Sequence, residues 1–185
     1  MKTLHRSEQG MTLLELMISI AIVSILLVVV APNVRDILIS NKITSQLNET
    51  SAVMQLARHT AIDEQNTAIF CPTQDFASCT SDWTDAKMAF IDLDASGGRN
   101  NNEELLASTD VSPEGIDIKG PNGAIQFDRS GAANLNTMLL FCDEDGEARF
   151  ARGLGLTVSG RVKVSQDTDN DSIHEDLNGV ALNCN

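Results

Sequence analysis

One acidic stretch of the chain has the spacing of a calcium-binding loop. Oxygen-bearing side chains alternate along it, a glycine follows and a glutamate closes the series, which is Asp92, Asp94, Ser96, Gly97 and Glu103. Calcium takes roughly six to eight hard oxygen ligands, and a glycine allows the sharp turn that gathers them. The flanking residues, however, have the pattern of strands, and turns rich in Asp, Asn and Gly are common without metal. Two interpretations stay open, a calcium loop and a solvated turn.

A second acidic run lies near the end of the chain. It contains Asp167, Asp169 and Asp171 at alternate positions, with Glu175 after them. The run has no glycine where a calcium loop needs its turn. A solvated linker leading to Cys184 therefore competes with a second cation site.

The chain has four cysteines, which is enough for two disulfides: Cys71, Cys79, Cys142 and Cys184. We favour Cys71–Cys79, which closes a short loop, together with Cys142–Cys184, which ties down the C-terminal tail. A zinc site is the alternative, but no two cysteines have the tight C-x2-C spacing and no histidine is near them in sequence. Disulfides are the preferred interpretation.

Side chains capable of nucleophilic catalysis are present but are not arranged for it. The chain has no Gly-x-Ser-x-Gly sequence, and its cysteines have no histidine nearby. His59 falls within a helical pattern and His174 within the acidic tail. We expect no catalytic residues, no enzyme activity, and no cofactor apart from the calcium considered above.

The bulk composition is that of one ordinary domain with an appendage. The chain has 185 residues, of which 42% are apolar, and a formal net charge of −13. Such a charge repels nucleic acid at long range, which argues against a general DNA-binding protein. We interpret it as the solvated surface of a secreted domain.

The first element that must position these residues is a long apolar segment. Met11–Ala31 carries one charge, Glu15, and is long enough to cross the bilayer core of about 30 Å as a helix. Lys2 and Arg6 precede it, so we expect a single pass with the N-terminus in the cytoplasm and the cysteines in an oxidising compartment. A cleaved secretory signal is the alternative, but Pro32 would then follow the cleavage site directly.

Beyond residue 32 the apolar residues recur at helical spacing. They form one stripe on an otherwise polar helix, comprising Val34, Leu38, Leu47, Met54, Ala57 and Ala61. We expect one helix from Met11 to about Ile62, kinked or locally melted at Pro32, which has no amide hydrogen.

Residues 63–185 alternate between short apolar runs and Gly or Asn turns. The strands expected are 67–71, 87–92, 116–119, 124–128, 138–142, 154–159 and 161–164. The fold class expected is α+β, a long N-terminal helix packed on an antiparallel sheet or small β-sandwich.

The start of the chain resembles the type IV prepilin signature. About twenty apolar residues follow a short basic segment and the run Gly10-Met11-Thr12-Leu13-Leu14-Glu15. The resemblance implies cleavage after Gly10 by a prepilin peptidase and N-methylation of Met11, where the family more often has Phe. It also implies that Glu15 pairs with the N-terminal amine of a neighbouring subunit during assembly, so that the two charges cancel in an apolar filament core.

Later landmarks are similar in order to the FimT/GspH branch of minor pilins and pseudopilins. They are Leu56–Ile62, Phe70-Cys71-Pro72, Cys79, Asp82-Trp83, Ala89–Asp92, Leu140–Asp143 and Ser159–Val164. Where the family usually has a second Gly-Trp, this chain has Ala86-Lys87-Met88.

In some FimT-type pilins a Gly-Arg-x-Arg motif near the C-terminus is associated with DNA binding. This chain has Gly160-Arg161-Val162-Lys163 in a similar place, and Lys163 keeps the charge but loses the bidentate fork of arginine. Arg149 and Arg152 could add to the patch, and the acidic run that follows opposes it. The alternative is an ordinary edge strand on which basic residues prevent mispairing.

The resemblance implies a minor pilin or pseudopilin of the bacterial inner membrane that enters a type IV pilus or a type II secretion pseudopilus, in initiation or at the tip. Its partners would be the prepilin peptidase, the membrane, and other major and minor pilins or pseudopilins. A subunit that contacts DNA at the filament tip is the alternative. The segments implied are a leader (1–10), a transmembrane assembly helix (11–31), its amphipathic continuation (32–62) and a β-rich periplasmic or extracellular domain (63–185).

Overall fold

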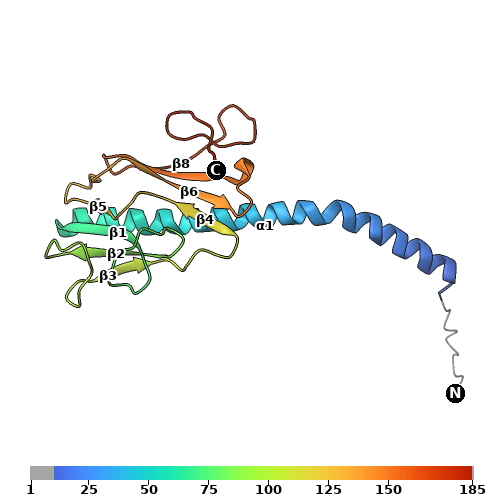
Figure 1. The fold of residues 1–185 in the computed structure, drawn as a ribbon, viewed down its shortest axis with the longest axis horizontal. Helices are drawn as coiled ribbons and strands as arrows, with labels where there is room; N and C mark the ends of the chain where they lie inside the picture. Colours follow the sequence, from blue (N-terminus) through green and yellow to red (C-terminus); the bar gives the residue numbers. More distant parts are fainter. Residues whose placement is uncertain (1–10, 185) are drawn as a thin grey trace, which may run out of the picture. The chain divides into compact units, whose positions relative to one another are not determined.

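The computed structural model of the chain describes residues 11–184, apart from the side chains of residues 29, 31 and 32. The chain divides into two compact units, residues 1–38 and residues 39–185. Helix α1 (Leu13–Glu64) contributes its first half to one unit and its second half to the other. All the strands belong to the second unit (Figure 1).

Helix α1 begins and ends at residues that satisfy its terminal backbone groups. The Oγ1 atom of Thr12 accepts a hydrogen bond from the N–H of Glu15 at 3.2 Å, which makes Thr12 the N-cap. At the other end Gln65 has a φ of 55°, and the N–H of Asn66 donates to the carbonyl of Ala61 at 3.2 Å. A left-handed residue followed by this longer-range bond is a common helix ending.

Of the two alternatives expected at Pro32, a kink and local melting, the melting is not observed, because the helical backbone continues through this residue. A proline removes one hydrogen bond, while the turns on either side keep theirs. Of the apolar stripe, the residues in the second unit are buried, namely Leu47, Met54, Ala57 and Ala61. Val34 and Leu38 belong to the first unit and are exposed.

The strands form two antiparallel four-stranded sheets, which confirms the α+β class. The strand order is β3-β2-β1-β5 in the first sheet and β4-β6-β7-β8 in the second. The strands are β1 (Thr67–Thr73), β2 (Ala86–Asp92), β3 (Leu105–Ser108), β4 (Ile116–Lys119), β5 (Ile125–Phe127), β6 (Thr137–Asp143), β7 (Arg152–Leu156) and β8 (Val162–Val164). A short 3-10 turn (Ala148–Phe150) precedes β7.

Two strands differ from the expectation by more than two residues, while the bounds of the others agree to within two. β3 was not expected, because its four residues show no alternation and it pairs only along the edge of β2. β7 ends at Leu156 rather than at residue 159, because Thr157–Gly160 makes the turn into β8. The N–H of Gly160 donates to the carbonyl of Thr157 at 2.8 Å, and Gly160 has a φ of 74°, which favours glycine.

One core joins α1 to both sheets in the second unit. Trp83 is buried at its edge, 5.6 Å from Phe70 between ring centroids, and its Nε1 donates to the carbonyl of Pro121 at 2.9 Å. The core includes Ile43, Leu47, Met54, Phe70, Ile91, Ile125, Phe127, Leu139, Phe141, Leu154 and Leu156. Burial of this set holds the helix and the sheets together.

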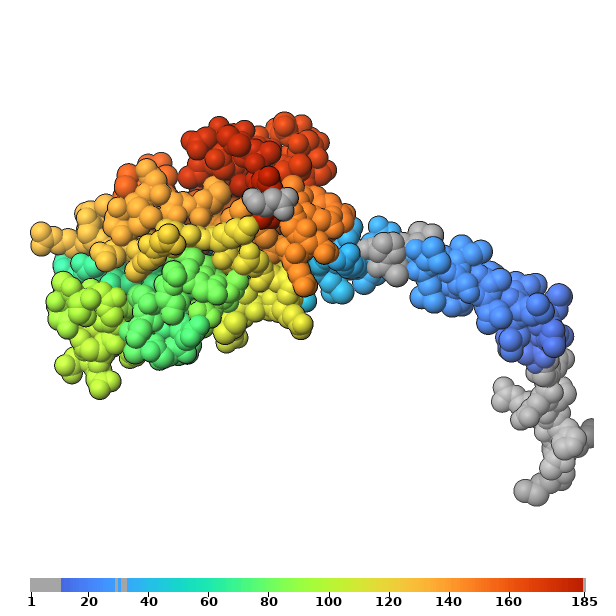
Figure 2. Space-filling model, viewed as in Figure 1, coloured from blue at the N-terminus to red at the C-terminus, as the bar shows by residue number. Residues whose placement is uncertain are grey.

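The C-terminal segment, red in Figure 2, lies over the second sheet. The N–H of Ser165 donates to the carbonyl of Gly153 at 2.8 Å, and Gln166 forms an isolated bridge with Glu175. A disulfide joins Cys142 on β6 to Cys184. The acidic run at 167–175 is therefore a folded loop, although most of its residues are exposed.

Candidate functional site

The first half of α1 presents an apolar surface that its own unit does not bury. Its large apolar residues between Leu13 and Leu27 are each at least half exposed. Its hydroxyls are satisfied internally, since Ser19 donates to the carbonyl of Glu15 and Ser24 to that of Ile20, each at 2.7 Å. By length and composition, α1 is apolar enough to cross a membrane.

Glu15 lies in the first turn of this helix and is exposed. Within residues 11–184 its carboxylate has no hydrogen-bond partner, while its N–H is held by Thr12. The Thr12 cap was not singled out from the sequence, although Thr-x-x-Glu before an apolar run is a recognisable helix start. Met11 precedes the helix and is exposed, and Gly10 lies outside the described residues.

The four cysteines form two disulfides, Cys71–Cys79 and Cys142–Cys184, with Cα–Cα distances of 5.6 and 5.8 Å. These are the two pairs that the sequence favoured. The first closes the loop after β1, and the second anchors the end of the chain to β6. Lys119 also holds this end, since its Nζ donates to the carbonyl of Cys184.

The loop after β2 brings together three of its four expected ligands. Carboxylate oxygens of Asp92, Asp94 and Glu103 lie within 4.8 Å of one another, whereas the Ser96 hydroxyl donates to the carbonyl of Gly98 at 3.0 Å. Asp92 and Glu103 are buried. Burial raises the pKa of Asp92, and hydrogen bonds from Ser96 lower that of Asp94.

Backbone amides already use the buried oxygens of this loop. Glu103 accepts from the N–H groups of Leu93 and Asn100, at 2.8 and 2.9 Å. Asp92 accepts from those of Ser96 and Gly97, at 3.1 and 3.2 Å. The two carboxylates therefore close the loop themselves, as in an Asx-type turn.

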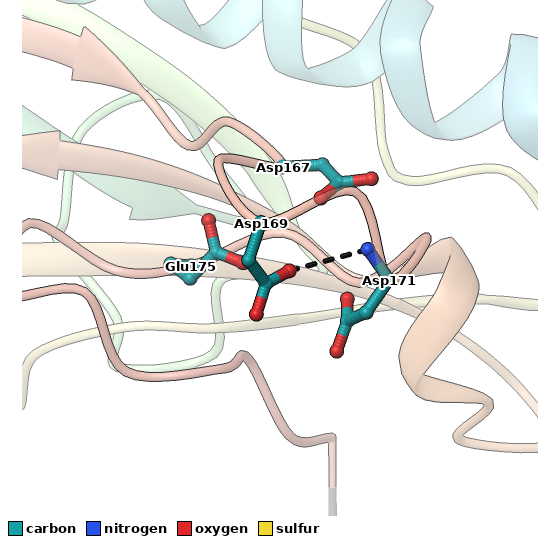
Figure 3. A group of neighbouring side chains, drawn as sticks. All are labelled: Asp167, Asp169, Asp171 and Glu175. Carbon is teal, nitrogen blue, oxygen red and sulfur yellow. Dashed lines mark hydrogen bonds between the residues drawn. The ribbon is translucent and has the colours of Figure 1, made fainter.

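The second acidic run folds in a similar way (Figure 3). Oxygens of Asp167, Asp169, Asp171 and Glu175 gather within 4.8 Å, and Asp169 accepts from the N–H of Asp171 at 3.2 Å. Glu175 is buried and accepts from both the N–H and the hydroxyl of Thr168 at 2.8 Å. Hydrogen bonds within the loop explain its shape.

A third acidic group was not expected from the sequence. It contains Asp143, Asp145 and Glu147 around the turn after β6. Asp143 is buried, and its Oδ1 accepts from the N–H of Glu147 at 2.8 Å. Glu147 in turn pairs with Arg149 at 2.6 Å, so a basic side chain already sits beside this group.

The four basic residues expected to form a patch lie at two places, with two residues at each. Arg149 and Arg152 lie around the start of β7, where Arg149 pairs with Glu147 and lies 4.3 Å from the ring centroid of Phe150. Arg161 and Lys163 are exposed at and beside the turn into β8. Lys163 pairs with Gly155, three residues along β7 from Arg152.

Comparison with known families and structures gives consistent matches. Residues 46–168 match the family model described as type II transport protein GspH, and residues 5–31 match the prokaryotic N-terminal methylation motif. No curated protein matches the chain.

Solved structures with a similar fold include two crystal forms of the type IV minor pilin FimU from Pseudomonas aeruginosa. The P21 form has a TM-score of 0.55 and 20% identity, over 68% of this chain and 90% of that one. The P65 form has a TM-score of 0.52 and 19% identity, over 66% and 92%. The minor pseudopilin EpsH of the Vibrio cholerae type 2 secretion system matches with a TM-score of 0.42 and 11% identity, over 66% and 91%.

Proposed function

The chain belongs to the GspH family, and from this we propose that it is a minor pilin or pseudopilin subunit that assembles through the first half of α1. A prepilin peptidase would cleave between Gly10 and Met11 and methylate the new N-terminal amine. Residues 1–10 are then the leader, 11–31 the membrane-spanning assembly helix, 32–62 its amphipathic continuation, and 63–185 the periplasmic or surface domain. The protein would cross the inner membrane once, with its N-terminus in the cytoplasm, and then act in initiation or at the tip of the filament.

The exposed apolar surface of α1 is the observation that carries this proposal. In water such a surface would cost about 25 cal/mol for each Å² left exposed. Either lipid or the helices of other pilins must therefore cover residues 13–30, and both environments suit a helix whose hydroxyls are internally bonded. In the assembly step, the helix would leave the lipid and pack against the helices of other pilins.

Glu15 would set the position of one subunit's helix along the helix of its neighbour during assembly. A carboxylate in an apolar span is costly unless a cation meets it. The methylated amine of Met11 on a neighbouring subunit would supply that cation. The absence of an intramolecular partner for the Glu15 carboxylate within the described chain leaves it available for such pairing.

Glu15→Ala tests the assembly role, with Glu64→Ala as a matched control at the exposed far end of α1. The amounts of processed protein in the inner membrane and in sheared filaments would be measured. We expect Glu15→Ala to reach the membrane in processed form but to disappear from filaments, and Glu64→Ala to behave as wild type. Equal incorporation of the two variants would contradict the proposal.

A second candidate function, contact with DNA, has one specific observation in its favour. Arg161, directly before β8, and Lys163, on β8, are two residues apart, and both are exposed at the edge of the second sheet. Each could meet a phosphate, and each such contact steepens the salt dependence of binding.

Arg161→Gln with Lys163→Gln tests this second candidate, and Arg129→Gln, an exposed arginine elsewhere, is the control. DNA binding would be measured by anisotropy at two salt concentrations, together with filament number. We expect weaker binding and a shallower salt dependence with unchanged filaments. Binding equal to that of Arg129→Gln would eliminate the DNA contact.

A further inference from the structure

A hollow of about 330 Å³ lies between the second half of α1 and the edge of the second sheet, and we call it the α1–β8 hollow. Its volume is at the lower end of the range for small-ligand sites, which is roughly 300–1,000 Å³. Three of its residues come from α1 and three from β7, β8 and the C-terminal segment: Thr44, Leu47, Asn48, Arg152, Val164 and His174.

Arg152 supplies a guanidinium that the protein has not paired with a carboxylate. Its Nη1 donates to the carbonyls of Arg149 and Ala151, at 3.0 and 2.8 Å. Within residues 11–184 no carboxylate forms an ion pair with it, although the chain has 26 acidic and 13 basic residues. Burial lowers the pKa of Arg152, and the charge of Asp167 opposes that shift. A half-buried arginine in this condition gains from an anionic partner.

His174 adds a second nitrogen to the hollow. Its Nδ1 lies 2.9 Å from the carbonyl oxygen of Ser165 and 3.1 Å from the Ser165 hydroxyl oxygen, so Ser165 holds the ring at this nitrogen. Within residues 11–184 the other ring nitrogen, Nε2, has no hydrogen-bond partner, and an imidazole nitrogen can donate to an anion. Asn48 and Thr44 add an amide and a hydroxyl from the exposed face of α1.

We propose that the α1–β8 hollow binds a carboxylate group, with Arg152 as its cationic anchor. The planar guanidinium matches the two oxygens of a carboxylate. Leu47 and Val164 give the hollow an apolar side that suits a short alkyl stem. The nearby charge of Asp167 disfavours a dianion such as phosphate. The group that fits is a carboxylate on a short aliphatic chain, either free or as an acidic side chain of a neighbouring subunit.

Glutarate is the probe that tests the site, and it does so whether or not the chain forms filaments. The full chain in detergent micelles would be labelled at its histidines, and the ring resonance of His174 followed while glutarate is added at constant ionic strength. His174→Gln identifies the resonance, and His59 on α1 is the internal reference. We expect a saturable shift of the His174 signal with a Kd of about 1–10 mM.

Matched variants make the test specific. Arg152→Gln should weaken glutarate binding about tenfold or more, whereas Arg161→Gln, which removes the same charge outside the hollow, should leave it unchanged. Asn48→Ala is on the exposed face of α1 and should weaken binding a few-fold without disturbing the fold. An unsaturated shift, the same shift with sodium chloride, or equal affinity in Arg161→Gln and both hollow variants would overturn the proposal.

Incorporation into filaments then distinguishes the two sources of the carboxylate. If Arg152→Gln lowers incorporation and Arg161→Gln does not, the carboxylate belongs to a neighbouring subunit. If incorporation is unchanged while glutarate binding is lost, the hollow serves a free carboxylate.

Discussion

The Nζ atom of Lys87 lies 3.3 Å from the Oγ atom of Ser112, in a part of the interior where the Lys87 side chain is completely buried. Lys87 belongs to β2, the strand between β1 and β3. Burial lowers its pKa to about 8, and the charges of Glu49, Asp85 and Asp82 counter that shift in part. The domain therefore holds a protonated amine in its core at neutral pH.

Lys87→Met should stabilise the protein at pH 7. The pKa of Lys87 falls from 10.5 to about 8 on folding, which corresponds to a cost of roughly 3 kcal/mol for the protonated form. Methionine keeps the length of the side chain without the charge. We expect a gain of about 1–3 kcal/mol in the free energy of unfolding, measured with urea. Lys42→Met, at an exposed position on α1, is the control and should change little.

The same substitution should remove a pH dependence. Between pH 8 and 10.5 the unfolded chain keeps the proton that folded Lys87 has lost, so the wild type becomes more stable as the pH rises through this window. Lys87→Met should lack that rise, and its advantage should shrink towards pH 10. A variant that is less stable than wild type at both ends of the window would contradict the buried-charge account.

The sequence could predict the elements whose signals are local. The long N-terminal helix and most strands depend on a pattern within one segment, and the structure retains both. The burial of Lys87 depends on longer-range packing. All seven residues of β2 are buried because strands flank it and both its faces are covered, whereas alternation predicts only one buried face.

The α1–β8 hollow is a binding site that local sequence patterns likewise do not predict. The sequence predicts a basic patch that includes Arg152 and an acidic tail that includes His174, because both predictions depend on neighbours along the chain. Only the pairing of β7 with β8 and the packing of α1 bring both to Asn48. No local motif encodes such a meeting of three segments.

Glu103→Gln should destabilise the loop after β2. Both Glu103 oxygens accept backbone N–H groups, so an amide must turn a donor towards one of them. We expect a loss of about 1–3 kcal/mol on urea unfolding, and almost none for Glu104→Gln, which is exposed next to it. Because these oxygens are already used, added calcium should leave the Tm of the wild type unchanged. A calcium-induced rise that Glu103→Gln abolishes would instead identify a calcium loop.

The two disulfides should contribute unequally to stability. Their sequence separations are 8 residues for Cys71–Cys79 and 42 for Cys142–Cys184. Loop-closure entropy predicts losses of about 2.5 and about 4 kcal/mol when each pair is replaced by serine. Urea unfolding of the two double variants would measure the difference. A larger loss for the Cys71–Cys79 pair would show that strain or contacts, rather than loop length, decide the order.

Gly160→Ala should be among the most damaging single-methyl additions in this domain. A Cβ atom at Gly160 would overlap the carbonyl oxygen of Gly131 and the Nε atom of Arg58. These two atoms are themselves joined, since Arg58 on α1 donates to Gly131 at 2.9 Å. The methyl group would therefore push α1 away from the turns at Gly131 and Gly160, which Arg58 contacts. We expect a loss of about 3 kcal/mol or more in the free energy of unfolding.

Gly97→Ala separates this steric effect from the cost of a left-handed backbone. Gly97 has a φ of +79°, close to the +74° of Gly160, but a Cβ atom there would meet nothing within 4 Å. The free energy of unfolding of Gly97→Ala should therefore fall only by the cost of a left-handed backbone at a residue with a Cβ atom, roughly 1–2 kcal/mol. The difference between the two variants is the contribution of the contact between α1 and the turn into β8. Equal losses would mean that the Arg58–Gly131 bond adapts to the methyl group and does not fix the helix on the sheets.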